Sequence, residues 1–131
     1  MNKIEQAISV LKTELQSITS INYIKDGRAN IDKFVTAEIV RNGFAFNFER
    51  GWNHQGIINT TMNLNIYANV GKEIELQDIV IQVLEKLTKN VTLNDTCRVT
   101  AMQNAIIDLK NENLAMLCAT INLDLEIQYD F

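Results

Sequence analysis

The sequence predicts a single α+β domain in which two helices cover one face of a mainly antiparallel β-sheet. Three observations lead to this fold class: two segments repeat apolar residues at helical spacing, others alternate apolar and polar residues, and turn residues separate them. The predicted order is α-β-β-β-β-α-β-β. Residues 1–131 are expected to form one domain, because the chain contains no linker, internal repeat or low-complexity tract.

The first helix is predicted from an apolar stripe at the start of the chain. Polar residues occupy the opposite side of this stripe, as in a helix that packs on a core with one face. The stripe consists of Ile4, Ile8, Leu11, Leu15 and Ile18. A short strand at 21–24 is expected next, and Asp26-Gly27 indicates a turn after it.

A tight hairpin is predicted in the following stretch. Two β-rich segments, 34–41 and 44–50, are separated by Asn42-Gly43, a pair that supplies the positive φ angles of a type I′ turn. Within the second segment aromatic residues occupy every other position, so their rings share one face, which we expect to join the core. These residues are Phe44, Phe46 and Phe48.

The second half of the chain predicts a strand, a helix and a long hairpin. Alternation of apolar and polar residues predicts a strand at 62–70, and a helix follows at 76–89, with acidic residues at its start and lysines in its last turn. The hairpin has arms at 97–110 and 115–131, joined by a turn at 111–113. Each helix has a single apolar stripe, so both are expected on one face, which leaves the other face for solvent or another subunit.

Composition and motifs argue against the common kinds of chemistry. The net charge of −4 disfavours non-specific binding to DNA or to an anionic membrane, and no apolar run is long enough to span a bilayer. Cys97 and Cys118 are expected to be reduced, buried thiols of a cytosolic protein. The single histidine, His54, cannot form a multi-histidine metal site, and the carboxylates lack the spacing of a calcium loop. We therefore expect no catalytic residue, no metal, no cofactor and no enzymatic activity.

The order of elements resembles the tail-terminator and tail-completion proteins of long-tailed bacteriophages. The resemblance is carried by a strand at 62–69, a helix at 76–89 and a terminal strand at 123–129, after an N-terminal helix and an extended β region. One departure is that the chain has no proline, whereas proline is often seen in the early loops of that family.

The resemblance implies a homo-oligomeric ring, commonly a hexamer, that caps the finished tail tube and docks to the head connector. Such a protein is assembled in the cytoplasm of the bacterial host and resides in the tail or neck of the virion. The family uses no catalytic site and no membrane, and it does not read nucleic acid sequence. The acidic balance of this chain is compatible with a passive conduit for DNA.

Two regions are expected to contact neighbouring proteins, because both should project from the sheet: residues 42–56 and the turn at 111–113. A tryptophan flanked by arginine and histidine in a glycine-bounded loop has the composition of an interface anchor, although its ring could equally cover an edge of its own sheet. The candidate contact residues are Asn42, Arg50, Trp52, Asn53, His54, Asn111, Glu112 and Asn113.

Two other functions fit the same sequence. A small-molecule-binding or enzymatic module of the cone-like α+β kind would use the concave face of the sheet and could recruit Tyr23, Tyr67, Asp108 or His54. A deep, closed cavity with convergent polar groups would distinguish it. An immunity-type or toxin–antitoxin protein-binding domain is equally compatible with the acidic charge.

Overall fold

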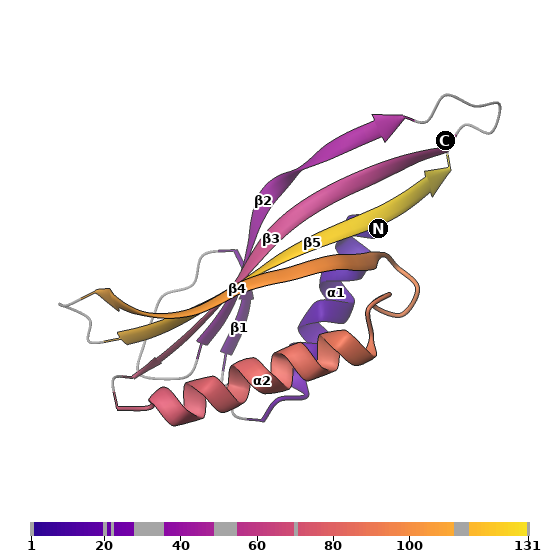
Figure 1. The fold of residues 1–131 in the computed structure, drawn as a ribbon. Coiled ribbons are helices and arrows are strands. Elements are labelled where there is room, and N and C mark those ends of the chain that lie inside the picture. Colours follow the sequence, from indigo (N-terminus) through magenta and orange to yellow (C-terminus); the bar gives the residue numbers. More distant parts are fainter. Residues whose placement is uncertain are drawn as a thin grey trace.

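A computed structural model describes residues 2–19, 21, 23–27, 36–48, 55–69, 71–111 and 116–130. Two helices and five strands follow one another in the order α1-β1-β2-β3-α2-β4-β5 (Figure 1). The predicted α+β class, with two helices and a mainly antiparallel sheet, is confirmed. The described part of the chain has one strand fewer than the predicted order.

The helices form where the apolar stripes predicted them. Helix α1 (Lys3–Gln16) begins at Asn2, whose side-chain oxygen accepts a hydrogen bond from the backbone N–H of Glu5 at 2.9 Å and so caps the helix. Helix α2 (Glu73–Lys89) carries acidic residues in its first turn and lysines in its last turn, an arrangement that the helix dipole favours. The side chains that α2 buries are Leu76, Ile79, Val80, Val83 and Leu87.

The sheet has the strand order β1-β2-β3-β5-β4. Strand β1 is parallel to β2, and the other neighbouring pairs are antiparallel. The strands are β1 (Tyr23–Asp26), β2 (Thr36–Phe48), β3 (Gln55–Asn69), β4 (Arg98–Asn111) and β5 (Met116–Asp130). Strand β3 begins before the predicted strand does, so Gln55 and Gly56 belong to the sheet and not to the expected loop.

The hairpin predicted at Asn42-Gly43 is wrong. Strand β2 runs without reversal through this pair and stays hydrogen-bonded to β3 on both sides of it. The register shifts between Arg41 and Gly43, so Asn42 is the extra residue of a β-bulge. Gly43 does have a positive φ, of 114°, whereas Asn42 does not, and a type I′ turn needs both. The local signal for an unusual backbone was therefore correct, but a bulge satisfies it as well as a turn does.

Both helices pack on one face of the sheet, which we call the helix-covered face (Figure 1). One continuous apolar core joins the buried stripes of α1 and α2 to the inward residues of the central strands. The strand residues of this core include Ala37, Ile39, Met62, Leu64, Ile66, Ile121, Leu123 and Leu125. The opposite side, which we call the open face, carries the alternate residues of the same strands, among them Glu38, Asn63, Asn65, Tyr67 and Asn122.

Coverage by the helices ends part of the way along β2. Arg41, at the bulge, forms a bidentate salt bridge with Glu5 in the first turn of α1, and its Nη2 lies 2.9 Å from Oε2 of that carboxyl group. Beyond this contact β2 rises away from both helices (Figure 1). As a result Phe44 and Phe46 are exposed, which corrects the expectation that they join the core. The side chain of Phe48 lies outside the described residues.

Candidate functional site

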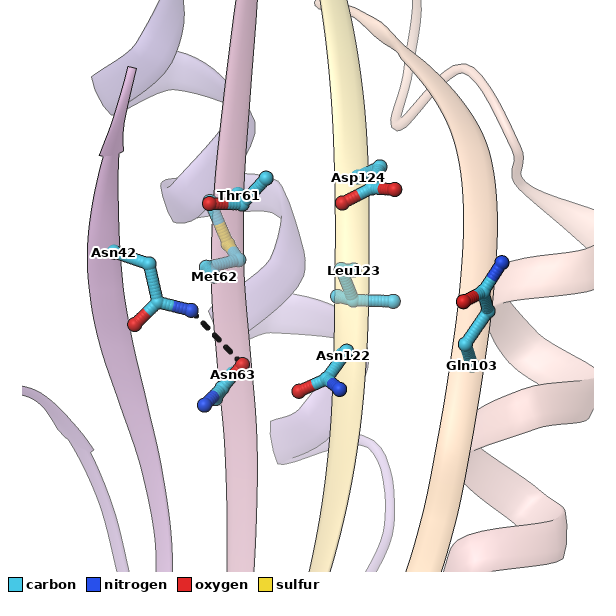
Figure 2. A pocket seen from close by; sticks show the side chains of 8 residues that line it. All are labelled: Asn42, Thr61, Met62, Asn63, Gln103, Asn122, Leu123 and Asp124. Atoms are coloured by element: carbon cyan, nitrogen blue, oxygen red, sulfur yellow. Dashed lines mark hydrogen bonds between the residues drawn. The ribbon is translucent and has the colours of Figure 1, made fainter.

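The open face carries cross-strand rows of polar side chains. Because each strand is in register with its neighbour, Asn63 of β3 lies opposite Asn122 of β5, which lies opposite Gln103 of β4. At the other end of this row, Asn42 Nδ2 donates a hydrogen bond to Asn63 Oδ1 at 2.9 Å. Four carboxamides therefore cross four strands in one row (Figure 2).

This row forms the floor of an open trough of about 370 Å³. Figure 2 shows the polar side chains in front of the sheet and a helix behind it. The lining residues are Asn42, Thr61, Met62, Asn63, Gln103, Asn122, Leu123 and Asp124. Met62 and Leu123 are buried in the core, so they contribute backbone to the floor. The other six offer amide and hydroxyl groups and a single carboxyl group.

The trough presents mainly neutral hydrogen-bonding groups. A carboxamide both donates and accepts hydrogen bonds without carrying charge, so a row of them can pair with backbone or polar side chains of another surface. None of the residues that line the trough is aromatic. The rim residues Thr61, Gln103 and Asp124 are exposed, so the trough faces solvent along its length. The rim of a protein–protein interface is similarly polar and accessible to solvent.

At the other end of the open face the polar side chains are mostly buried. We call this group the Glu38 cluster, and its members are Glu38, Asn65, Tyr67, Cys118 and Thr120. The carboxyl group of Glu38 is 1% exposed, and its Oε1 accepts hydrogen bonds from Tyr67 Oη at 2.6 Å and from Asn65 Nδ2 at 2.9 Å. Asn65 Oδ1 in turn accepts from Thr120 Oγ1 at 3.0 Å, and Cys118 Sγ lies 3.7 Å from the same hydroxyl oxygen. The cluster thus links β2, β3 and β5.

The hydrogen bonds of this cluster run in one direction. A hydroxyl has one proton, so the Thr120 hydroxyl that donates to Asn65 can only accept from the Cys118 thiol. Burial raises the pKa of Tyr67 far above its ordinary value, and the hydrogen bond to Glu38 adds to this effect. Tyr67 therefore stays a neutral phenol near neutral pH and cannot act as a base. Each member has a hydrogen-bond partner and the bonds join three strands, so the arrangement stabilises the strand register.

The second face of the sheet was expected to be left for solvent or another subunit, but this cluster shows that part of it is buried within the chain. Thr36, Glu38, Asn65 and Tyr67 lie on that face and are buried within the chain. Among the described residues, the exposed part of this face lies around the trough and beyond it, where Ala45 of β2 and Arg98 of β4 are exposed.

A second pocket, of about 320 Å³, lies where β4 begins. Its lining includes Lys3, whose Nζ donates to the backbone oxygen of Gln128 at 2.8 Å, together with Cys97 and Arg98. Cys97 is half-buried, and burial raises the pKa of its thiol, although a hydrogen bond with Thr96 acts in the opposite direction. A thiol with a raised pKa is a poor nucleophile.

The structure places few of the candidate contact residues predicted from the sequence. Asn42 lies in β2 at the bulge and lines the trough, so it is a strand residue and not the tip of a hairpin. Asn111 is the last residue of β4, and its side chain lies outside the described residues. The remaining candidates also lie outside them: Arg50, Trp52, Asn53, His54, Glu112 and Asn113.

Sequence reasoning missed the Glu38 cluster as a unit, although Tyr67 was named as a possible pocket residue. The available signal was the polar residue at every second position of three predicted strands. That alternation is the ordinary mark of a solvated face, so it cannot tell a buried carboxyl group from an exposed one.

Within the described ranges, no three His, Cys, Asp or Glu side chains come close enough together to hold a metal ion. Over the same ranges, neither helix is long and apolar enough to cross a membrane. No protein-family model matches the chain, and no curated protein matches it either.

Proposed function

We propose that this chain is a structural assembly protein, a tail terminator or tail-completion subunit that forms a ring on the end of a tail tube and joins it to the head connector. The observation that carries the proposal is that the helices cover only part of the sheet. The helices cover one face only as far as Arg41 along β2, whereas the distal part of β2 and the trough present aromatic rings and neutral amides to the outside.

Two features support assembly over chemistry. First, Phe44 and Phe46 are both exposed on a strand that continues beyond the helices, and aromatic side chains are enriched in protein–protein interfaces. Second, the trough presents carboxamides at the surface of a sheet whose strands β2 and β3 are held together by the buried hydrogen bonds of the Glu38 cluster, which suits a rigid contact surface. The choice of a tail terminator among assembly proteins comes from the resemblance of the sequence to that family.

Imaging the purified protein by negative-stain electron microscopy tests the ring directly. We expect closed rings of uniform diameter, alone or on the ends of purified tail tubes. Disrupting the gene in the genome that encodes it tests the role: lysates should then contain tails of irregular length without heads. Normal particles from the disrupted strain, with purified protein that binds no tube, would contradict the proposal.

A further inference from the structure

Two exposed apolar residues lie at opposite edges of the sheet. Phe44 is 69% exposed on β2, and Val91, in the turn between α2 and β4, is 41% exposed. Ile74 and Ile81 on the outer side of α2 are exposed as well. Phe44 and Val91 differ from these two because the strand register places them at the same level of the sheet.

The register defines this level. Phe44 lies opposite Thr60, Thr60 lies opposite Leu125, and Leu125 lies opposite Val99 of β4. The backbone N–H of Val99 donates to the backbone oxygen of Val91 at 2.7 Å, so Val91 lies against β4 in the same row. Leu125 belongs to the core, and residues of one row share a face, so Phe44 and Val99 both lie on the helix-covered side.

The turn that carries Val91 is held firmly. Three consecutive residues, Leu93, Asn94 and Asp95, have positive φ angles of 44°, 57° and 64°. Leu93 is fully buried in the core. The Asn90 side chain donates to Asn94 Oδ1 and accepts a hydrogen bond from the backbone N–H of Asn94. Asn and Asp tolerate left-handed backbone, but for a leucine it is unfavourable and persists only where the surroundings impose it. Val91 is thus presented on a preorganised turn, which lowers the entropy lost on binding.

We propose that Phe44 of one copy packs against Val91 and Val99 of the next copy, as the interface that joins subunits side by side. This inference rests on the proposed function only in requiring an oligomer. A second copy fits because both patches lie in one row: displacing a copy sideways across the sheet brings them together without a shift along the strands. Two different patches meet, so the contact is head-to-tail, as a closed ring requires. No charged side chain occurs from Asn42 to Phe46 to oppose the approach.

Cysteine crosslinking tests the pairing. The double variant Phe44→Cys with Val91→Cys should give a ladder of covalent multimers on mild oxidation, because each copy joins two neighbours. All variants carry Cys97→Ser, because the free, half-buried Cys97 lies between Val91 and Val99 and competes for the thiol introduced at Phe44. Neither single variant should give the ladder, and Cys97→Ser alone is the background control. Absence of a ladder from the double variant overturns the inference. A crosslinked dimer from Phe44→Cys alone also overturns it, since that result means that two β2 strands meet around a twofold axis.

Mixing variants tests the polarity of the contact. Phe44→Asp and Val91→Asp should each weaken self-association by about 30-fold or more, the loss typical of a central interface residue. An equimolar mixture should form 1:1 heterodimers and nothing larger, because one intact Phe44 meets one intact Val91. Ile74→Asp is the matched control, as exposed as Phe44 but outside the row, and should associate like the parent. If it weakens association as much as Phe44→Asp does, the interface is elsewhere.

The failure of this inference and the failure of the proposed function give different results. Rings that form normally from Phe44→Asp and Val91→Asp would reject the interface and leave the proposed function standing. A parent chain that stays monomeric in sedimentation at high concentration and on tail tubes would reject both the interface and the ring of the proposed function. The gene disruption described above decides the role of the protein independently of either outcome.

Discussion

The two halves of β2 differ in burial, and the half with the more polar residues is the buried one. The first half, Thr36 to Ile39, contains a hydroxyl and a carboxyl group, yet all four of its residues are buried. The second half, Asn42 to Phe46, contains two phenylalanines and no charge, yet its residues are exposed. The first half is paired with β1 and lies over the helices, whereas the second continues past both. Burial along one strand therefore depends on what packs against each residue, not on its polarity.

The largest expected effect on stability comes from a substitution in the first half of β2. Ile39→Ala should lower the free energy of unfolding by about 2–5 kcal/mol, because Ile39 is fully buried and its truncation leaves a cavity in the core. Phe44→Ala removes a larger side chain from the second half and should change stability by no more than about 0.5 kcal/mol. Urea unfolding of the two variants, each measured as a dissociated monomer, checks both values. Equal losses would show that the second half also belongs to the core.

The polar residue of the buried half gives the next largest effect. Glu38→Ala should cost about 1–3 kcal/mol, since it leaves the buried donors of Tyr67 and Asn65 without an acceptor. Glu38→Gln keeps an acceptor oxygen in place and should cost clearly less. Chemical denaturation of both variants provides the measurement. If the two variants lose the same stability, the hydrogen bonds of the cluster are not what stabilises this half of the strand.

The bulge that separates the halves gives the third effect: Gly43→Ala should lower the free energy of unfolding by about 1–2 kcal/mol through backbone strain alone. A Cβ atom at Gly43 would meet nothing within 4 Å, so the cost of Gly43→Ala comes from the φ of 114° and not from a clash. Gly71→Ala, at a φ of 93° with equally open space and outside β2, is the matched control and should cost a similar amount. A loss at Gly43 well above that at Gly71 would mean that the bulge also sets the register of β2.

The smallest effect concerns Tyr67 and depends on pH. Tyr67→Phe should cost about 1 kcal/mol near neutral pH, because it removes one of the two donors to Glu38. The pKa of Tyr67 is raised in the folded chain above its ordinary value of 10.0, so the unfolded chain ionises first as pH increases. The stability contributed by the neutral phenol is complete below pH 10 and is lost as pH rises above it.

Thermal melts of the parent and Tyr67→Phe at several alkaline pH values test this sign. Above pH 10 the parent should lose stability with pH more steeply than the variant, and absorbance at alkaline pH should show one tyrosine that ionises only on unfolding. Identical slopes for the two proteins would contradict the burial of the phenol as the cause of its raised pKa.

Much of the fold followed from local patterns. The apolar stripes of both helices, the alternation in β3 and β5, and the acidic start of α2 are properties of short segments, so they could be recognised without knowing their neighbours. The candidate site was harder. Of the predicted contact residues, only Asn42 has a described side chain. It lies within one continuous strand, where the sequence had predicted a hairpin turn.

By itself, the sequence determined the two helices, the strand-forming segments and the need for unusual backbone at Gly43, because periodicity and φ preference act over a few residues. Only the tertiary structure decided that β2 is continuous, that Glu38 is buried while Phe44 is exposed, and that Phe44 and Val91 share a row. These features depend on which distant segments pair and where the helices stop covering the sheet. Such long-range packing leaves no signature in any single segment.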